Sequence, residues 1–187
     1  IDLSLQKLFI ARDRFGIKPM YYLVNKGVLG FSSELKSLKY IDEFTFRLDH
    51  SKIDEYLLFR NNLNGTLFHN IQSLRPGCCL EYSLSGGITI KQYFNVESYS
   101  RPVTPSGNLE EYAKEMERWL GESVRRQLMS DVKLGCQLSG GIDSSLVTWL
   151  ANKNSTKGNF ESVSIVFENK NFNEEKYIDH VRDVIGM

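Results

Sequence analysis

The sequence predicts a mixed fold: an α+β part of antiparallel strands, followed by an α/β part built on a parallel sheet. Up to about residue 96, short β-rich runs are separated by turn residues. From residue 131, strand and helix patterns alternate with short connections, which favours right-handed crossovers and parallel strands. Between the two parts, the segment 96–108 is rich in Ser, Pro and Gly and is predicted to be a linker. The chain thus divides into a first part, 1–95, and a second part, 109–187.

The composition is that of an ordinary globular protein without a charge bias. Of the 187 residues, 41% are hydrophobic and 25% are charged, and 23 Lys and Arg balance 23 Asp and Glu. This balance gives no reason to expect a nucleic-acid partner. No apolar run approaches the roughly 20 residues of a membrane helix, so no membrane partner is expected either. Three cysteines, none with the spacing of a zinc site, favour a reduced, cytoplasmic protein.

The first part is predicted to contain five strands and two short helices. In the first strand, Leu8 and Ile10 alternate with Phe9 and Ala11, as expected when one face of a sheet is buried. The predicted strands are KLFIARD (7–13), MYYLVN (20–25), VLGFSS (28–33), CCLEYSL (78–84) and ITIKQYF (88–94), with turns at Lys26–Gly27 and Ser85–Gly87. The predicted helices are ELKSLK (34–39) and KIDEYLLF (52–59), the latter capped by Ser51 with Asp54 as its acidic partner.

A long helix is predicted to follow the linker. Asn108 is a favourable N-cap, and Glu111 stands where a capping box needs an acidic residue. Apolar residues recur at spacings of three and four along this helix, which predicts one face that packs in a core. They are Leu109, Tyr112, Ala113, Met116, Trp119, Leu120, Val124 and Leu128.

The rest of the second part reads as strand, helix, strand, helix. The strands are VKLGCQL (132–138) and FESVSIVF (160–167), the first helix contains SSLVTWLANK (144–153), and the last, EEKYIDHVRDVIG (174–186), ends at a glycine.

The string LSGGI occurs twice, and its two copies have different surroundings. The copy at 84–88 lies between two strand-like runs, so its glycines are expected only to reverse the chain. The copy at 138–142 follows a buried strand and opens a helix. Free backbone N–H groups and the helix dipole make such a helix start suitable for binding an anion. The second copy is therefore the candidate for a phosphate site.

The residues around the second copy point to phosphate and a metal. Gly140 and Gly141 have no side chains, so phosphate oxygens are expected to approach their backbone. Hydroxyl donors come from Ser139, Ser144 and Ser145. A carboxylate beside bound phosphate is repulsive unless a divalent cation lies between them, so Asp143 predicts Mg²⁺. The alternative is a plain strand-to-helix turn with a Ser or Asp cap.

The motif resembles the SGGxDS pyrophosphate loop of the ATP-pyrophosphatase superfamily, here Ser139–Ser144. It lacks the lysine of a Walker loop. In the first part, ARDRFGIKPMYY, FSSELKSL and TLFHNIQSLRPG resemble the closing part of the glutaminase domain of glutamine-hydrolysing asparagine synthetases. The stretch LMSDVKLGCQLSGGIDSS (128–145) resembles the opening of that family's synthetase domain.

The resemblance implies a fold and a reaction. The fold is the end of an N-terminal-nucleophile glutaminase sandwich, then a truncated Rossmann-like ATP-pyrophosphatase domain. The reaction is conversion of aspartate to asparagine, with ammonia from glutamine and a β-aspartyl-AMP intermediate formed from ATP. By the same resemblance, Ser139–Ser145 hold pyrophosphate, Asp143 holds Mg²⁺, and Leu138 and Ile165 flank the adenine. A homodimer is left open.

Several roles stay undecided at this point. Glu174 lies in a stretch, Phe172–Glu174, that is similar to the family's F-[DN]-E motif, but an acidic residue is also favoured in a first helical turn. For Arg12, Asp13 and Arg14 the alternatives are an interface to the synthetase site and an ion-pair cluster, and we favour the ion-pair cluster. The family's nucleophile is a cysteine at the mature N-terminus, and no cysteine of this chain corresponds to it, so the chain is expected to be an internal fragment. Two alternatives remain: an amidotransferase acting on another carboxylate (a surface-polysaccharide sugar acid or a β-lactam precursor), or a non-catalytic nucleotide-binding remnant.

Overall fold

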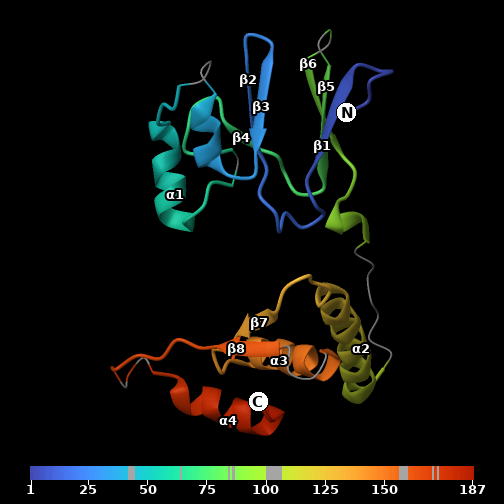
Figure 1. Cartoon of the computed structure of the whole chain (residues 1–187), viewed down its shortest axis with the longest axis vertical. Coiled ribbons are helices and arrows are strands. Elements are labelled where there is room, and N and C mark those ends of the chain that lie inside the picture. Colours follow the sequence, from blue (N-terminus) through green and yellow to red (C-terminus); the bar gives the residue numbers. More distant parts are fainter. Residues whose placement is uncertain are drawn as a thin grey trace. The chain divides into compact units, whose positions relative to one another are not determined.

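The computed structural model describes residues 1–41, 45–63, 65–83, 85, 87–99, 107–155, 160–169, 171 and 173–187. The chain divides into two compact units, Ile1–Pro102 and Val103–Met187, which we describe one at a time (Figure 1). Most of the predicted linker, residues 100–106, lies outside the described residues, and the part before it forms a short 3₁₀ helix, η3 (Val96–Tyr99).

Two antiparallel sheets of three strands form the first unit, which confirms the predicted antiparallel part. One sheet has the order β1-β5-β6 and the other the order β3-β2-β4. The strands are β1 (Lys7–Ala11), β2 (Tyr21–Asn25), β3 (Val28–Ser32), β4 (Gln72–Ser73), β5 (Cys78–Ser83) and β6 (Gly87–Gln92).

The two predicted hairpins are present. Lys26 and Gly27 connect β2 to β3 with φ values of 47° and 79°, the positive pair that a tight two-residue turn needs. In the other hairpin, Ser83 is paired with Gly87, so the first LSGGI string connects two antiparallel strands as predicted. Of the residues between that pair, 84 and 86 lie outside the described part of the chain.

The sheet β3-β2-β4 has side chains packed on both of its faces. Tyr22 and Leu29 pack against a buried cluster on the other sheet that includes Ile10 and Leu80. On the opposite face, Leu23 belongs to a second buried cluster, completed by Leu38 and Ile71. The alternation of residues along β2 thus places neighbouring side chains in two different cores.

The helical segments of this unit differ from the prediction at their starts. The segment predicted as a helix at 34–39 is a 3₁₀ helix, η1 (Leu35–Tyr40). The prediction that Ser51 caps the next helix is wrong. The carboxylate of Asp49 accepts hydrogen bonds from the backbone N–H (3.1 Å) and hydroxyl (2.6 Å) of Ser51 and begins a 3₁₀ turn, η2 (His50–Lys52), which leads directly into α1 (Ile53–Phe59). An aspartate can cap as well as a serine, and here the earlier residue has the extended backbone of a cap.

Arg12 and Asp13 do not form the predicted ion-pair cluster. The Arg12 guanidinium donates to the carbonyl oxygens of Gly16 (2.9 Å), Lys18 (2.9 Å) and Leu74 (2.7 Å), and to the hydroxyl of Ser73 (3.3 Å). It therefore ties the loop after β1 to the segment after β4.

The Asp13 carboxylate organises the same loop from the other side. It accepts hydrogen bonds from the backbone N–H groups of Phe15 (3.2 Å), Ile17 (3.0 Å) and Lys18 (3.0 Å). These bonds, the one from Lys18 first, hold the pKa of Asp13 below its ordinary value.

The second unit contains a parallel pair of strands, as predicted. Its elements are α2 (Leu109–Gln127), β7 (Leu134–Gln137), α3 (Ile142–Asn154), β8 (Phe160–Val163) and α4 (Glu175–Ile185). Strands β7 and β8 pair from Leu134↔Phe160 to Gln137↔Val163. The capping box of Asn108 and Glu111 is present, and α4 ends at Gly186 as expected.

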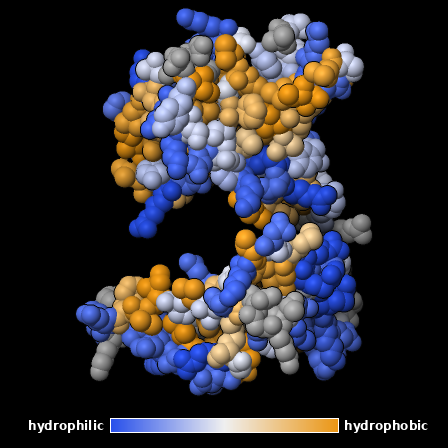
Figure 2. Space-filling view, viewed as in Figure 1, coloured by the Kyte–Doolittle hydropathy of each residue, from blue (hydrophilic) through white to orange (hydrophobic). Residues whose placement is uncertain are grey.

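The apolar face of α2 packs only in its C-terminal half. Leu120 and Val124 are partly buried where α2 contacts α3. In the N-terminal half, Leu109 is 85% exposed and Met116 is 57% exposed, so the prediction of one continuous core face is wrong for this half. Apolar side chains also reach the surface elsewhere in both units (Figure 2). Within the described part of the chain, no helix is long and apolar enough to cross a membrane.

Replacing Arg12 tests its role as a tie between two segments. Arg12→Leu leaves three carbonyl groups and one hydroxyl without their donor, so it should lower the free energy of unfolding by about 2–4 kcal/mol. Chemical denaturation followed by circular dichroism measures this. Arg14→Leu is the control, because among the described residues the Arg14 guanidinium forms no hydrogen bond or ion pair and lies over the Phe94 ring, 5.4 Å from its centroid. Its effect should stay within about 1 kcal/mol. Equal effects of the two changes would contradict the assignment.

Acid should weaken the first unit through Asp13. Its pKa is lower in the folded than in the unfolded chain, so its contribution is present above the unfolded pKa and is lost as the pH falls through the folded pKa. Below about pH 4, the thermal midpoint of the wild-type chain should therefore fall more steeply than that of Asp13→Asn. Melting curves recorded between roughly pH 2 and pH 7 give the thermal midpoint of each protein as a function of pH. If the two midpoints fell equally steeply toward low pH, the prediction would be ruled out.

Candidate anion-binding loop

The second LSGGI string connects β7 to α3 through residues 138–141. Its first residue, Leu138, is 2% exposed. The Leu138 N–H donates to the carbonyl oxygen of Val163 (3.0 Å), and its own carbonyl oxygen accepts from the hydroxyl of Ser164 (2.7 Å). The loop therefore starts from a backbone that is already hydrogen-bonded to the end of β8. The helix after the loop is also anchored, because the hydroxyl of Thr148, which is fully buried, lies 3.0 Å from the Cys136 sulfur on β7.

Gly140 is held by α4. Its φ is +78°, in the left-handed region that favours glycine. A Cβ added at this position would lie 2.8 Å from the Cβ of Tyr177 and 3.0 Å from the backbone nitrogen of Ile178. The structure therefore gives Gly140 a constraint that sequence reasoning missed, namely the close approach of a helix about 37 residues later in the chain.

Gly141 has a different environment. It is the N-cap residue of α3, with φ −73° and ψ 161°, a conformation open to most residues. A Cβ there would meet the hydroxyl oxygen of Ser139 at 3.5 Å, which is ordinary contact. Its missing side chain thus leaves the space in front of the helix start open.

The three serine hydroxyls are not equivalent. The Ser145 hydroxyl donates to the carbonyl oxygen of Gly141 (2.7 Å). The Ser144 hydroxyl accepts from the Ser139 N–H (3.3 Å) and lies within 3.1 Å of the Gly141 carbonyl oxygen and 2.9 Å of the Ser139 hydroxyl. Since a hydroxyl has one proton, Ser144 and Ser145 mainly hold the turn in this conformation. Ser139 is exposed at the outer end of the network.

The start of α3 presents N–H donors. Among the residues that the structure describes, none accepts a hydrogen bond from the backbone N–H of Ile142, Asp143 or Ser144. These are the first helical N–H groups, which have no partner within a helix, and the dipole of this 13-residue helix adds positive potential at the same place. Ile142 and Asp143 are exposed at this helix start, and Ser144 is half-buried.

Asp143 lies at this helix end with its side chain exposed. The described residues contain no group of three or more His, Cys, Asp or Glu that could enclose a metal by themselves. Mg²⁺ commonly uses one or two carboxylates, phosphate oxygens and water. A single carboxylate beside an open set of N–H donors therefore fits Mg²⁺ that arrives with a phosphate ligand.

The other expected site residues lie in different environments. Strand β8 ends at Val163, so the prediction of a strand through residue 167 is wrong: β7, its partner, turns into the loop at this point. Ile165 consequently lies beyond the strand and is 69% exposed, whereas the Leu138 side chain is in the core. Glu174 is the N-cap residue of α4, but its side chain makes no capping hydrogen bond. Phe172 lies outside the described residues.

Comparisons with known proteins agree on one family. Residues 1–94 match the family described as "Glutamine amidotransferase domain", and residues 115–187 match "Asparagine synthase". The asparagine synthetase [glutamine-hydrolyzing] 1 of Bacillus subtilis (strain 168) is 32% identical over 181 residues, which cover 96% of this chain and 28% of the relative. The enzyme numbered 3 from the same organism is 34% identical over 146 residues, 77% of this chain and 23% of the relative. The chain thus spans less than a third of the length of these relatives.

The two glycines of the loop should respond differently to alanine. Gly140→Ala forces a side chain into the left-handed region and against the backbone of α4, so it should lower the free energy of unfolding of the second unit by about 1–3 kcal/mol. Gly141→Ala is the matched control and should change it by less than about 1 kcal/mol. Denaturant unfolding monitored by tryptophan fluorescence checks both, and a tolerated Gly140→Ala would contradict the packing described for α4.

Proposed function

Because this chain belongs to the glutamine-hydrolysing asparagine synthetase family, we propose that it is part of an ATP-dependent amidotransferase that converts aspartate to asparagine. In this proposal, residues 1–95 are the closing part of a glutamine amidotransferase domain. Residues 109–187 open a Rossmann-like domain that binds ATP and Mg²⁺. Glutamine, aspartate and ATP are the substrates.

One observation supports the nucleotide site most directly. The free N–H groups of Ile142, Asp143 and Ser144, the open position in front of Gly141 and the Asp143 carboxylate all lie at the start of α3. N–H donors at a helix start suit phosphate oxygens, while an adjacent carboxylate suits them only when a cation shares the site. The combination favours a polyphosphate that carries Mg²⁺ over a simple anion.

Each group then has a separate task. The α3 N–H groups and the Ser139 hydroxyl bind the β- and γ-phosphate oxygens, and Asp143 holds the metal against them. When bound, Mg²⁺ would neutralise the negative charge that develops on the leaving pyrophosphate. The exposed side chain of Ile165 and the backbone at Leu138 border the adenine.

The reaction that follows is an adenylation. An oxygen of the aspartate side-chain carboxylate attacks the α-phosphorus of ATP, and the bond from the α-phosphorus to the bridging oxygen breaks, which releases pyrophosphate and leaves β-aspartyl-AMP. Ammonia from glutamine then attacks the activated carbonyl carbon, loses a proton and displaces AMP. Activation is needed because a free carboxylate is a poor electrophile, whereas AMP is a good leaving group. The loop contributes by holding the leaving pyrophosphate in place.

Asp143 offers a test in which the sign of the effect depends on the metal. With Mg²⁺ present, Asp143→Ala should weaken pyrophosphate binding to this chain by about tenfold or more, because the cation loses its protein ligand. Without Mg²⁺, the same change should leave binding equal or stronger, because it removes a negative charge beside the phosphate. Isothermal titration calorimetry measures both.

Asp131→Ala is the control, since it removes another exposed carboxylate of the same unit. In a full-length protein that carries this chain, Asp143→Ala should also abolish aspartate-dependent ATP–pyrophosphate exchange and leave glutamine hydrolysis intact. An Asp143→Ala chain whose pyrophosphate binding keeps the wild-type dependence on Mg²⁺ would refute the proposed metal role. Exchange that requires a carboxylate other than aspartate would refute the substrate.

A further inference from the structure

The peptide unit that joins Leu138 to Ser139 is held from both sides by serine hydroxyls. Its carbonyl oxygen, that of Leu138, accepts a hydrogen bond from the Ser164 hydroxyl (2.7 Å). Its N–H group, that of Ser139, donates to the Ser144 hydroxyl oxygen (3.3 Å). Ser144 belongs to α3, whereas Ser164 follows β8. Because a peptide unit is planar, hydrogen bonds to its opposite edges restrict the orientation of the whole unit.

This peptide unit is the entrance to the anion-binding loop. On its upstream side, Leu138 is in the core and its N–H donates to the carbonyl oxygen of Val163 (3.0 Å). On its downstream side are Ser139, whose hydroxyl lies 2.9 Å from that of Ser144, and the left-handed Gly140. A rotation of the peptide unit would therefore move the Ser139 hydroxyl and the glycine after it, while the core side stayed in place.

Ser164 takes the place of a backbone donor at the end of the sheet. Strand pairing stops at Gln137↔Val163, and a longer parallel ladder would continue with a backbone N–H of the second strand donating to the Leu138 carbonyl oxygen. Among the backbone groups that the structure describes, none donates to this oxygen, so the Ser164 hydroxyl is its donor. The chain after Ser164 can thus leave the sheet, and Ile165 is 69% exposed, while the loop stays tied to the end of β8.

We propose that Ser164 is a positioning residue for the pyrophosphate site, an inference that rests on the function proposed above. Its hydroxyl is bonded to the loop backbone and is given no contact with phosphate. It holds the Leu138–Ser139 peptide unit in the orientation in which the Ser139 hydroxyl and the N–H groups at the start of α3 serve one ligand. Ser164 lies 26 residues after Leu138, so nothing in the loop motif itself indicates this role.

The test measures the binding of magnesium pyrophosphate to the complete chain by isothermal titration calorimetry. Ser164→Ala should weaken binding by about three- to tenfold, because the loop loses one hydrogen bond that orients it. Ser164→Thr keeps the hydroxyl and should restore most of the affinity. Ser162→Ala is the matched control: Ser162 is also half-buried and lies two residues earlier on β8, and its hydroxyl makes no hydrogen bond among the described residues. Its affinity should equal that of the wild-type chain.

Thermal melting separates positioning from a purely structural role. A hydroxyl that only stabilised the fold would lower the thermal midpoint when removed and leave the dissociation constant of the folded chain unchanged. An unchanged dissociation constant in Ser164→Ala, or a loss in Ser164→Thr as large as that in Ser164→Ala, would overturn the inference and leave the proposed function standing. A wild-type chain that does not bind magnesium pyrophosphate would overturn both.

A second variant keeps the test decisive if Ser164→Ala does not fold, as checked by circular dichroism. Ser164→Cys keeps the size of the side chain but has only a weak donor. It should bind magnesium pyrophosphate more weakly than the wild-type chain, and equal affinity would count against the positioning role.

Discussion

The geometry of the anion-binding loop depends on the contact between Gly140 and the first turns of α4. The left-handed backbone of Gly140 lets the chain leave β7 and enter α3 within four residues, and the backbone of Tyr177 and Ile178 lies where any side chain would be. If that contact were lost, the N–H groups at the start of α3 would no longer be held in one orientation. Helix α4, which follows β8, thus supports the loop that follows β7. Parallel strands allow a site to be built in this way from segments that lie far apart in the sequence.

The first unit depends on a comparable long-range tie. Arg12 bonds to carbonyl oxygens on its own loop and to the segment around Ser73 and Leu74, just where β4 leads toward β5. Because β4 belongs to one sheet and β5 to the other, this connection bears on how the two sheets pack around Ile10 and Leu80. An arginine whose donors are used in this way is a structural residue, even though a charged side chain in a loop invites a functional interpretation.

Local patterns predicted those features whose cause is local. The turn at Lys26–Gly27, the capping box of Asn108 and Glu111, and the parallel pairing of β7 with β8 each follow from a few neighbouring residues or from the order of elements. The error in the length of the second predicted strand arose where a distant partner decides, whereas the error in the Ser51 cap is local, because Asp49 caps two residues earlier. The β-branched run after Val163 has the composition of a strand, but β7 turns away and leaves it unpaired in the described structure.

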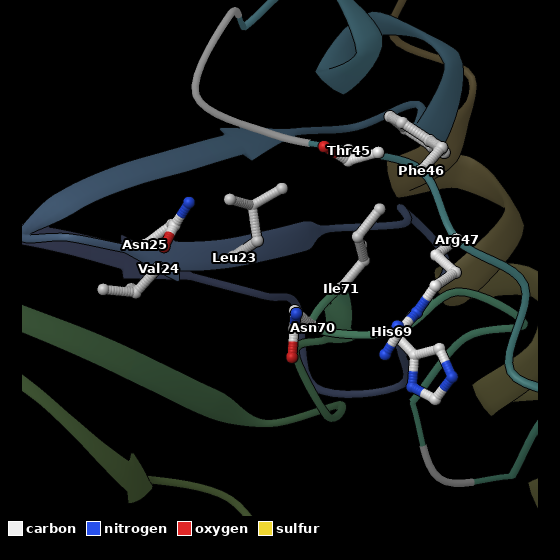
Figure 3. Close-up of a pocket in the computed structure, with 9 residues that line it drawn as sticks. All are labelled: Leu23, Val24, Asn25, Thr45, Phe46, Arg47, His69, Asn70 and Ile71. Atoms are coloured by element: carbon white, nitrogen blue, oxygen red, sulfur yellow. The ribbon is translucent and has the colours of Figure 1, made fainter.

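The candidate site also has some features that depend on neighbouring residues and others that depend on distant segments. The strand–loop–helix context and the exposed Asp143 could be anticipated from the motif, because both lie within a dozen residues. The packing of α4 on Gly140 could not, since nothing near that glycine indicates which later segment approaches it. Arg47 and His69 were not noted in the sequence for a similar reason: only the folded chain brings segments 45–47 and 69–71 together beside β2 (Figure 3).

The pairing of β1 with β5 has a consequence for how the chain folds during synthesis. Lys7 pairs with Ser83 and Ala11 with Cys79, so β1 leaves the ribosome about seventy residues before its partner, roughly several seconds earlier at ordinary translation rates. During that interval Ile10 lacks its later neighbours Leu74, Cys78 and Leu80, and β1 lacks its pairing with β5. The loop after β7, by contrast, needs only the next fifty or so residues to acquire both β8 and α4. The first unit therefore depends on contacts of longer sequence separation than the loop after β7 does.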